Sequence, residues 1–90
     1  MKLQEIFQSK AQVRLVEHLL LHREKVFNQA GLARTLDVSP STIARIAQPL
    51  VKSRIVLFES YGKGMKIFGL NQESQVTRNL IDFYDKLRSL

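Results

Sequence analysis

The stretch QAGLARTLDVSPSTIARIAQPLVKSRIV, residues 29–56, decides the fold of this 90-residue chain. Asp37 stands between two segments with helical spacing of apolar residues, and Asp tolerates the left-handed backbone that a tight turn needs. Ser39 is a favourable N-cap, and Pro40 suits the first position of a helix, where its missing N–H is not needed. The stretch therefore predicts a helix, a three-residue turn and a second helix, the layout of a DNA-binding helix-turn-helix.

Both predicted helices separate apolar from polar side chains. The apolar positions are Ala30, Leu32, Ala33 and Leu36 in the first helix and Ile43, Ile46, Ala47 and Leu50 in the second. The opposite face of the second helix carries Ser41, Arg45, Gln48 and Lys52. Residues 42–58 contain no Asp or Glu, whereas an ordinary solvated amphipathic helix mixes both charges on its outer face. The pattern favours a helix that enters the DNA major groove.

The sequence around the turn resembles a known family. Residues 32–46, LARTLDVSPSTIARI, resemble the helix-turn-helix core of prokaryotic winged-helix transcriptional regulators. Residues 7–20, FQSKAQVRLVEHLL, resemble the first helix of an archaeal and bacterial branch of that group, so the resemblance covers roughly residues 7–70. It implies a winged-helix fold and DNA binding. Two positions depart from the pattern: Pro49 inside the recognition helix removes a backbone hydrogen bond, and Arg54 replaces the usual Gly, so we expect a differently built C-cap.

A basic β-hairpin is predicted after the second helix. Residues 56–61 and 65–70 are rich in β-branched and aromatic side chains, and Gly62-Lys63-Gly64 between them is a turn signal. A hairpin in this position is the wing of a winged helix, and Lys63 and Lys66 would lie near DNA phosphates. Tyr61 is expected to pack on the hairpin. Core positions are expected at Phe58, Ile67 and Phe68, and a short third strand at residues 25–27.

A heptad pattern marks the C-terminal segment. We expect a helix over residues 74–90 with Asn71 as its cap. Its apolar residues recur at alternating intervals of four and three, at Val76, Leu80, Phe83, Leu87 and Leu90. This narrow stripe favours a homodimer in which the terminal helices of two chains pack together. The alternative is that the helix folds back onto the N-terminal helix of its own chain.

The N-terminal helix is predicted to begin at a capping box, Ser9-Lys10-Ala11-Gln12. Its apolar residues cover more than half of the helical wheel, so two surfaces must cover them; they are Val13, Leu15, Val16, Leu19, Leu20 and Leu21. His18 and His22 have the i, i+4 spacing of metal ligands. We interpret both as solvated side chains, because no third ligand lies nearby in the sequence and the chain has no cysteine.

Composition narrows the function further. The net charge is +6, and residues 25–66 hold seven Lys or Arg against two acidic residues, so the charge belongs to the motif and the hairpin. This clustering makes double-stranded DNA the expected partner. The longest apolar run, Leu19-Leu20-Leu21, is far too short for a membrane span, and the N-terminus lacks a signal-peptide core. We therefore expect a cytoplasmic protein without membrane association, which the absence of cysteine also suits.

The expected DNA contacts form two groups. Base edges would be read by Ser41, Thr42, Arg45 and Gln48. Phosphates would be held by Ser39, Lys52, Arg54, Lys63 and Lys66. Arg45 is the best candidate for a bidentate contact to guanine, and Gln48 for a contact to adenine.

The expected fold is mainly α with a small β-hairpin (α+β): a winged helix-turn-helix with an added C-terminal helix. Residues 1–70 would form the DNA-binding domain, and residues 71–90 a dimerisation helix within the same compact unit. No catalytic motif, cofactor loop or metal cluster is visible, so we expect no enzyme activity, cofactor or metal. The expected function is that of a homodimeric, sequence-specific transcriptional regulator. Two alternatives stay open: a winged-helix protein–protein adaptor, and an architectural protein that binds DNA of any sequence.

Overall fold

The computed structural model describes residues 8–90, which form four helices and three strands. In chain order they are α2 (Lys10–Leu21), β1 (Val26–Asn28), α3 (Gln29–Leu36), α4 (Pro40–Lys52), β2 (Val56–Tyr61), β3 (Met65–Leu70) and α5 (Gln75–Arg88). Residues 1–7, the start of the expected DNA-binding domain and of the family resemblance, lie outside the described part. None of the described helices is long and apolar enough to cross a membrane.

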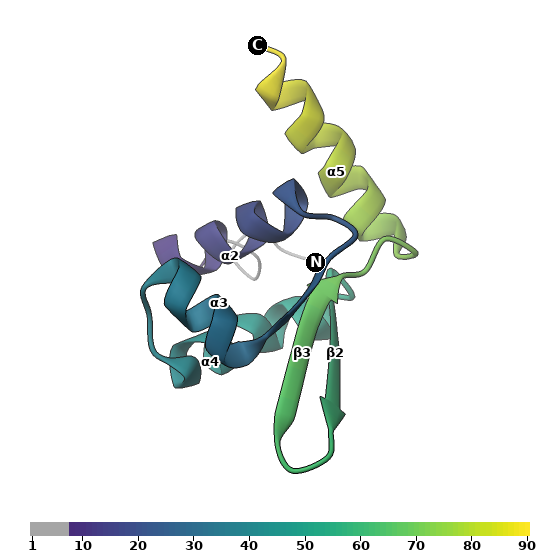
Figure 1. Cartoon of the computed structure of the whole chain (residues 1–90). Coiled ribbons are helices and arrows are strands. Elements are labelled where there is room, and N and C mark those ends of the chain that lie inside the picture. The colour runs from purple at the N-terminus through teal and green to yellow at the C-terminus, as the bar shows by residue number, and fades with distance from the viewer. Residues whose placement is uncertain (1–7) are drawn as a thin grey trace.

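The architecture is that of a winged helix with an added C-terminal helix, which confirms the predicted fold class. Helices α2, α3 and α4 pack together beside an antiparallel sheet with the strand order β1-β3-β2 (Figure 1). The hairpin of β2 and β3, the wing, projects from one side of this body, and α5 projects from the other. At the wing tip Gly62 and Gly64 have φ angles of 51° and 90°, a left-handed conformation that favours glycine. The short third strand expected at residues 25–27 is present as β1, one residue further along, and it pairs with β3.

The hydrophobic core lies where the three helices meet the base of the sheet. Its fully buried side chains include Leu15, Leu19, Leu32, Ile43, Leu50 and Ile55. Gln12 of α2 is buried among them, and its Nε2 donates a 3.0 Å hydrogen bond to the backbone oxygen of Ile46 in α4. Because a buried amide requires a partner, this bond fixes the position of α4 on α2.

The start of α2 is a variation on the predicted capping box. Ser9 caps the helix, since its Oγ accepts a hydrogen bond from the backbone N–H of Gln12. The Oε1 of Gln12 accepts from the backbone N–H of Gln8, one residue before the expected donor. The oxygen and the nitrogen of the Gln12 side-chain amide thereby each have a hydrogen-bond partner, one locally and one across the core.

The turn between α3 and α4 has the predicted chemistry. Asp37 adopts φ 56° and ψ 51°, and the Oγ of Ser39 accepts a 3.1 Å hydrogen bond from the backbone N–H of Thr42. Val38 packs against the core between the two helices. The buried face of α4 is the predicted one, with Ile43, Ile46, Ala47 and Leu50. The prediction for Ala30 was wrong, because this residue is exposed on the side of α3 that faces the wing.

The C-terminus of α4 corrects the expectation of an unusual cap. Arg54 adopts φ 64°, the left-handed conformation that glycine usually provides after a helix. The backbone N–H of Ile55 donates to the oxygen of Leu50 at 2.9 Å, and that of Arg54 donates to the oxygen of Val51 at 3.0 Å. This is the ordinary Schellman arrangement, built with arginine in place of glycine. Leu50 and Ile55, which this turn joins by a hydrogen bond, are both fully buried, and their burial holds Arg54 in the left-handed conformation.

We expect Arg54→Gly to stabilise the protein by about 0.5–1 kcal/mol, because a side chain is unfavourable in left-handed backbone and glycine carries no such cost. Thermal unfolding of the wild type and the variant measures the difference. The matched control is Arg54→Ala, which removes the same charge but keeps the Cβ atom, and it should give no gain. An equal gain from both variants would assign the effect to charge and not to the backbone.

Phe58 is a second correction. It was expected in the core, but its side chain is 41% exposed. Its ring packs against that of Phe68, with 5.2 Å between the ring centroids, and both side chains line a hollow between α4 and the wing. Phe68 is buried and Ile67 is half-buried, as their positions on β3 predicted.

Helix α5 is anchored by its first turns. Its N-cap is Ser74 and not the predicted Asn71, whose backbone N–H instead donates to the oxygen of Ile55. The buried Thr77 donates from its Oγ1 to the backbone oxygen of Arg54 at 3.1 Å. These bonds fasten the start of α5 to the end of α4, so the orientation of the C-terminal helix is coupled to the recognition helix.

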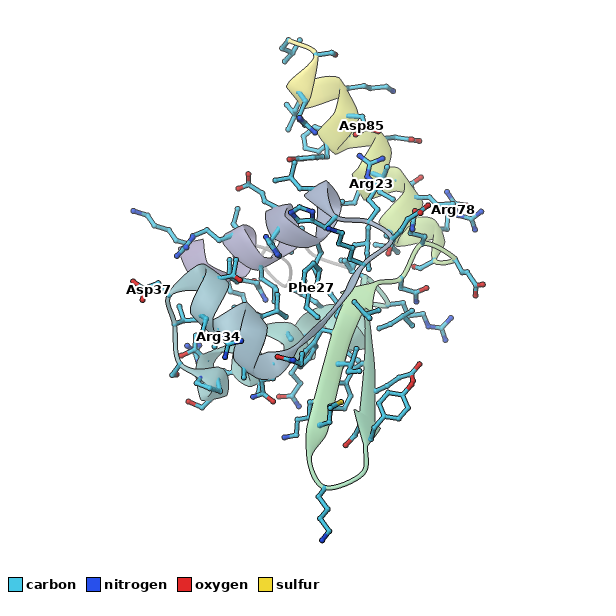
Figure 2. All side chains as sticks on the ribbon, in the orientation of Figure 1. Arg23, Phe27, Arg34, Asp37, Arg78 and Asp85 are labelled. Atoms are coloured by element: carbon cyan, nitrogen blue, oxygen red, sulfur yellow. The ribbon has the colours of Figure 1, made fainter. Side chains whose placement is uncertain are left out.

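An ion pair supports α5 further along. Arg23, just after α2, contacts Asp85 (Figure 2), and the hydrogen bond from Arg23 lowers the pKa of the Asp85 carboxyl. Leu80, Ile81 and Tyr84 are half-buried against the core. The helix therefore packs in part on its own chain, while its outer half extends beyond the body.

Candidate nucleic-acid interface

The outward face of α4 is polar and contains no acid. Ser41, Arg45, Gln48 and Lys52 are all exposed on it, opposite the buried apolar face. Within residues 8–90 neither Arg45 nor Lys52 takes part in an ion pair. Their charges are therefore available to an anionic partner, and Pro49 does not interrupt the helix, which continues to Lys52.

Three hydroxyl groups gather at the N-terminus of α4. The Oγ of Ser39 lies 3.0 Å from the Oγ of Ser41 and 2.8 Å from the Oγ1 of Thr42. Ser39 and Ser41 are exposed, whereas Thr42 is half-buried. A helix N-terminus carries partial positive charge, and hydroxyls there add further donors for a phosphate. The cluster thus suits the DNA backbone as well as a base edge.

The wing brings two lysines to the same side of the molecule as α4. Lys63 lies in the tip between the two glycines, and Lys66 on β3 lines a hollow together with residues of α4. Tyr61, half exposed, donates its hydroxyl hydrogen to Glu59 of the same strand, so it is engaged within the hairpin. The structure therefore places Lys66 beside α4, and Lys63 at the wing tip, where it lines a hollow with Arg34 and Pro40.

Two hollows separate the wing from the helices. The α4–wing hollow is lined by Ala44, Gln48, Val51, Lys52, Phe58, Lys66 and Phe68. The α3–wing hollow is lined by Asn28, Gln29, Ala30, Arg34, Pro40, Lys63, Gly64, Met65 and Lys66. Neither set of lining residues, all within the described part of the chain, includes an acidic side chain. The two hollows are thus suited to a polyanion, whereas the exposed acids Asp37, between α3 and α4, and Glu59, on β2, lie outside them.

Arg34 is a site residue that the sequence reasoning missed. It is exposed on α3 and shares the α3–wing hollow with Lys63 and Lys66 (Figure 2 shows its position on the helix). In the sequence Arg34 was visible only as one of the basic residues of the segment 25–66. The apolar pattern of α3 shows which face is buried, but it does not show which exposed residues lie toward the wing. Arg54, in contrast, was predicted, and it is exposed at the far end of α4.

The heptad stripe of α5 is largely uncovered in the single chain. Exposed fractions are 36% for Val76, 57% for Phe83, 49% for Leu87 and 100% for Leu90, while Leu80 is half-buried. Phe83 and Leu87 also line a groove that α5 forms with Val16 and Leu20 of α2. An apolar surface of this extent on a helix that leaves the body is typical of a contact with another chain.

The two histidines of α2 belong to an aromatic cluster. The ring centroids of His18 and His22 are 4.7 Å apart, and that of Phe27 lies 4.9 Å from His18. Burial, and then the neighbouring His22, lower the pKa of His18. No group of three metal-ligating side chains occurs in residues 8–90. The contacts with Phe27 give the histidines a packing role.

No protein-family model and no curated protein sequence matches this chain. Solved structures do share its fold. Reduced HlyU from Vibrio cholerae matches with a TM-score of 0.70 at 15% identity, over 94% of this chain and 83% of that one. A possible transcriptional regulator from Methanosarcina mazei matches with a TM-score of 0.69 at 17% identity, over 99% of this chain and 85% of that one.

MepR from Staphylococcus aureus is a third structure with this fold. Its complex with DNA matches with a TM-score of 0.65 at 15% identity, over 94% of this chain and 73% of that one. In another MepR structure this chain spans only 60% of the longer protein. MepR is a transcription regulator of the multidrug efflux pump MepA. At these identities the likeness establishes the fold, and the chain thus has the winged-helix fold that transcription regulators such as MepR adopt.

Proposed function

We propose that the protein is a sequence-specific, double-stranded DNA-binding transcriptional regulator that acts as a homodimer in the cytoplasm. The observation that carries the proposal is the acid-free polar face of α4, with Lys66 of the wing beside it and Lys63 at the wing tip. The proposed function includes no enzyme activity. The shared fold with a regulator that was solved bound to DNA adds support.

The proposed base contacts come from α4. Arg45 donates two hydrogen bonds to O6 and N7 of a guanine, and Gln48 pairs with an adenine one turn further along. Ser41 and Thr42 contact base edges near the start of the helix. The proposed phosphate contacts are Ser39, Lys52, Arg54, Lys63 and Lys66. We add Arg34 to this set, because it lines a hollow with Lys63 and Lys66.

The proposed dimer uses α5. Two copies of the stripe Val76, Leu80, Phe83, Leu87 and Leu90 pack against each other, and the α2–α5 groove receives part of the second helix. Burial of these half-exposed side chains supplies the hydrophobic free energy of association. The two α4 helices would then meet successive major grooves of an inverted repeat.

Selection of bound duplexes from a random pool tests the function directly. An enriched inverted repeat that competes far better than random duplex in a gel-shift assay is the expected result. Weak binding to every duplex would favour the protein–protein adaptor. Tight binding without enrichment of any sequence would favour the architectural protein.

Lys63→Ala tests the role of the wing. We expect equal losses of affinity for the selected site and for random duplex, because a phosphate contact carries no sequence information. The slope of log affinity against log salt concentration should become shallower by about one unit. The matched control is Lys86→Ala on α5, which removes the same charge away from the proposed interface and should change neither quantity. A loss confined to the selected site would contradict the phosphate assignment.

A further inference from the structure

The α4–wing hollow combines apolar and cationic side chains in an unusual way for a surface that faces DNA. Ala44 and Val51 of α4 and Phe58 and Phe68 of the sheet provide its apolar lining. The polar members of the lining are Gln48, Lys52 and Lys66. The volume is about 230 Å³, enough for a small ring but not for an extended ligand. Phe58, which is 41% exposed, is part of this lining.

All three polar lining residues belong to the proposed DNA interface, so a bound duplex would cover the hollow. If Lys52 and Lys66 contact phosphates, the hollow between them lies along the backbone of one DNA strand. In that backbone, charged phosphates alternate with deoxyribose rings. The deoxyribose is the apolar unit of that strand, and it has the size of a small ring. The other apolar group of DNA on this side, the thymine methyl, lies at the base edges on the floor of the major groove.

We propose that the α4–wing hollow receives one deoxyribose of each half-site, with the adjacent phosphates on Lys52 and Lys66, and that it selects DNA over RNA at this nucleotide. The inference rests on the proposed function. In this proposal Lys52 and Lys66 hold the phosphates and Gln48 contacts a base, so the 2′-hydroxyl of a ribose would meet Val51 and Phe58, which offer no hydrogen-bond partner. A hydroxyl that loses water without gaining a partner is unfavourable, and the 2′-hydroxyl is the group by which proteins tell RNA from DNA.

The experiment moves a single ribonucleotide, position by position, through the duplex that the selection yields. Fluorescence anisotropy measures the affinity of the wild-type protein for each duplex. We expect one position per half-site at which affinity falls by about 3- to 10-fold, and changes below about twofold elsewhere. A 2′-fluoro nucleotide at the same position is the control for altered sugar pucker, because it lacks the hydroxyl donor, and it should bind nearly as well as deoxyribose.

Val51→Thr connects the sensitive position to the hollow. The substitution keeps the shape of the side chain and adds a hydroxyl, so a ribose at the sensitive position gains a hydrogen-bond partner. We expect the ribose penalty to fall to about twofold or less in this variant. The matched control is Val26→Thr on β1, an exposed valine outside the hollow, which should leave the full penalty in place.

The possible outcomes separate this inference from the function on which it rests. If the protein binds the unmodified duplex but shows no ribose penalty, the sugar site is wrong and the proposed function stands. The same holds if Val51→Thr leaves the penalty unchanged. Failure to bind any duplex would overturn both proposals.

Discussion

Arg45→Ala is expected to weaken binding to the selected site by about 1–3 kcal/mol, a loss of roughly 5- to 150-fold, with little change on random duplex. The reason is that a bidentate bond from a guanidinium to guanine forms only on the correct base pair. Arg45 is exposed in the middle of α4 and has no ion-pair partner in residues 8–90, so no competing interaction must first be broken. Anisotropy titrations with the selected duplex and with a scrambled duplex of equal length give the two affinities.

Arg14→Ala is the control for Arg45→Ala. Arg14 is exposed on α2 and has the same charge, but it lies outside both hollows of the proposed interface. We expect small and equal effects on the two duplexes. If Arg45→Ala weakened both duplexes alike, the role of Arg45 would be electrostatic, and the assignment of a base contact would be wrong.

The helix-turn-helix could be predicted because its signals are local. The left-handed Asp37, the cap Ser39 and the first-turn Pro40 act within four consecutive residues, and the structure has each of them in its predicted role. The division of α4 into a buried and an exposed face follows from helical geometry alone. The wing was predictable for the same reason, since two segments with β-branched and aromatic residues flank Gly62-Lys63-Gly64.

The mistaken predictions depend on contacts between distant segments. Arg54 takes a left-handed conformation because its neighbour Ile55 is buried and because Thr77, more than twenty residues away, bonds to its oxygen. Phe58 stays half exposed because it lines the hollow between α4 and the wing, where α4 does not cover the sheet. Neither the burial nor the bond has a signature in the adjacent sequence.

The candidate site, like the fold, could be predicted where its residues are close in the sequence. The row on α4 was visible because its members lie on one helix, and the structure exposes Arg45, Gln48 and Lys52 together. The place of Arg34 in the site and the α4–wing hollow could not be predicted. Both depend on how a helix and the wing, which are separate in the chain, lie next to each other. Only the excess of basic residues over the whole segment indicated that these elements share one surface.

The two packing alternatives for α5 both find support. Leu80 is half-buried against the body, as a helix folded onto its own chain requires. Phe83 and Leu87 are half exposed although they belong to the same stripe. A single chain therefore covers Leu80 and leaves Phe83 and Leu87 half exposed, which is the reason to place the decisive substitution at Phe83.

Phe83→Asp is expected to split the dimer into monomers, because it would put a charged group into an interface that excludes water. Phe83 is 57% exposed in the single chain, so the substitution leaves the monomer folded. Asn79→Asp is the matched control: it introduces the same carboxylate at an exposed position of α5 outside the stripe and preserves the acceptor for Gln75. Sedimentation should find a dimer for the wild type and for Asn79→Asp, and a monomer of 10.4 kDa for Phe83→Asp.

The DNA affinity of Phe83→Asp tests whether the dimer is needed for full DNA binding. A two-fold dimer contacts half-sites about 34 Å apart, and its salt dependence sums the phosphate contacts of both chains. With about four phosphate contacts in each chain, the log–log salt slope would be near −7 for the dimer and about half of that for the monomer. Titration of one inverted-repeat duplex with both proteins measures the slopes. A wild type that sediments as a monomer and binds a single half-site at full affinity would refute the dimer and leave the DNA-binding surface of α4 and the wing intact.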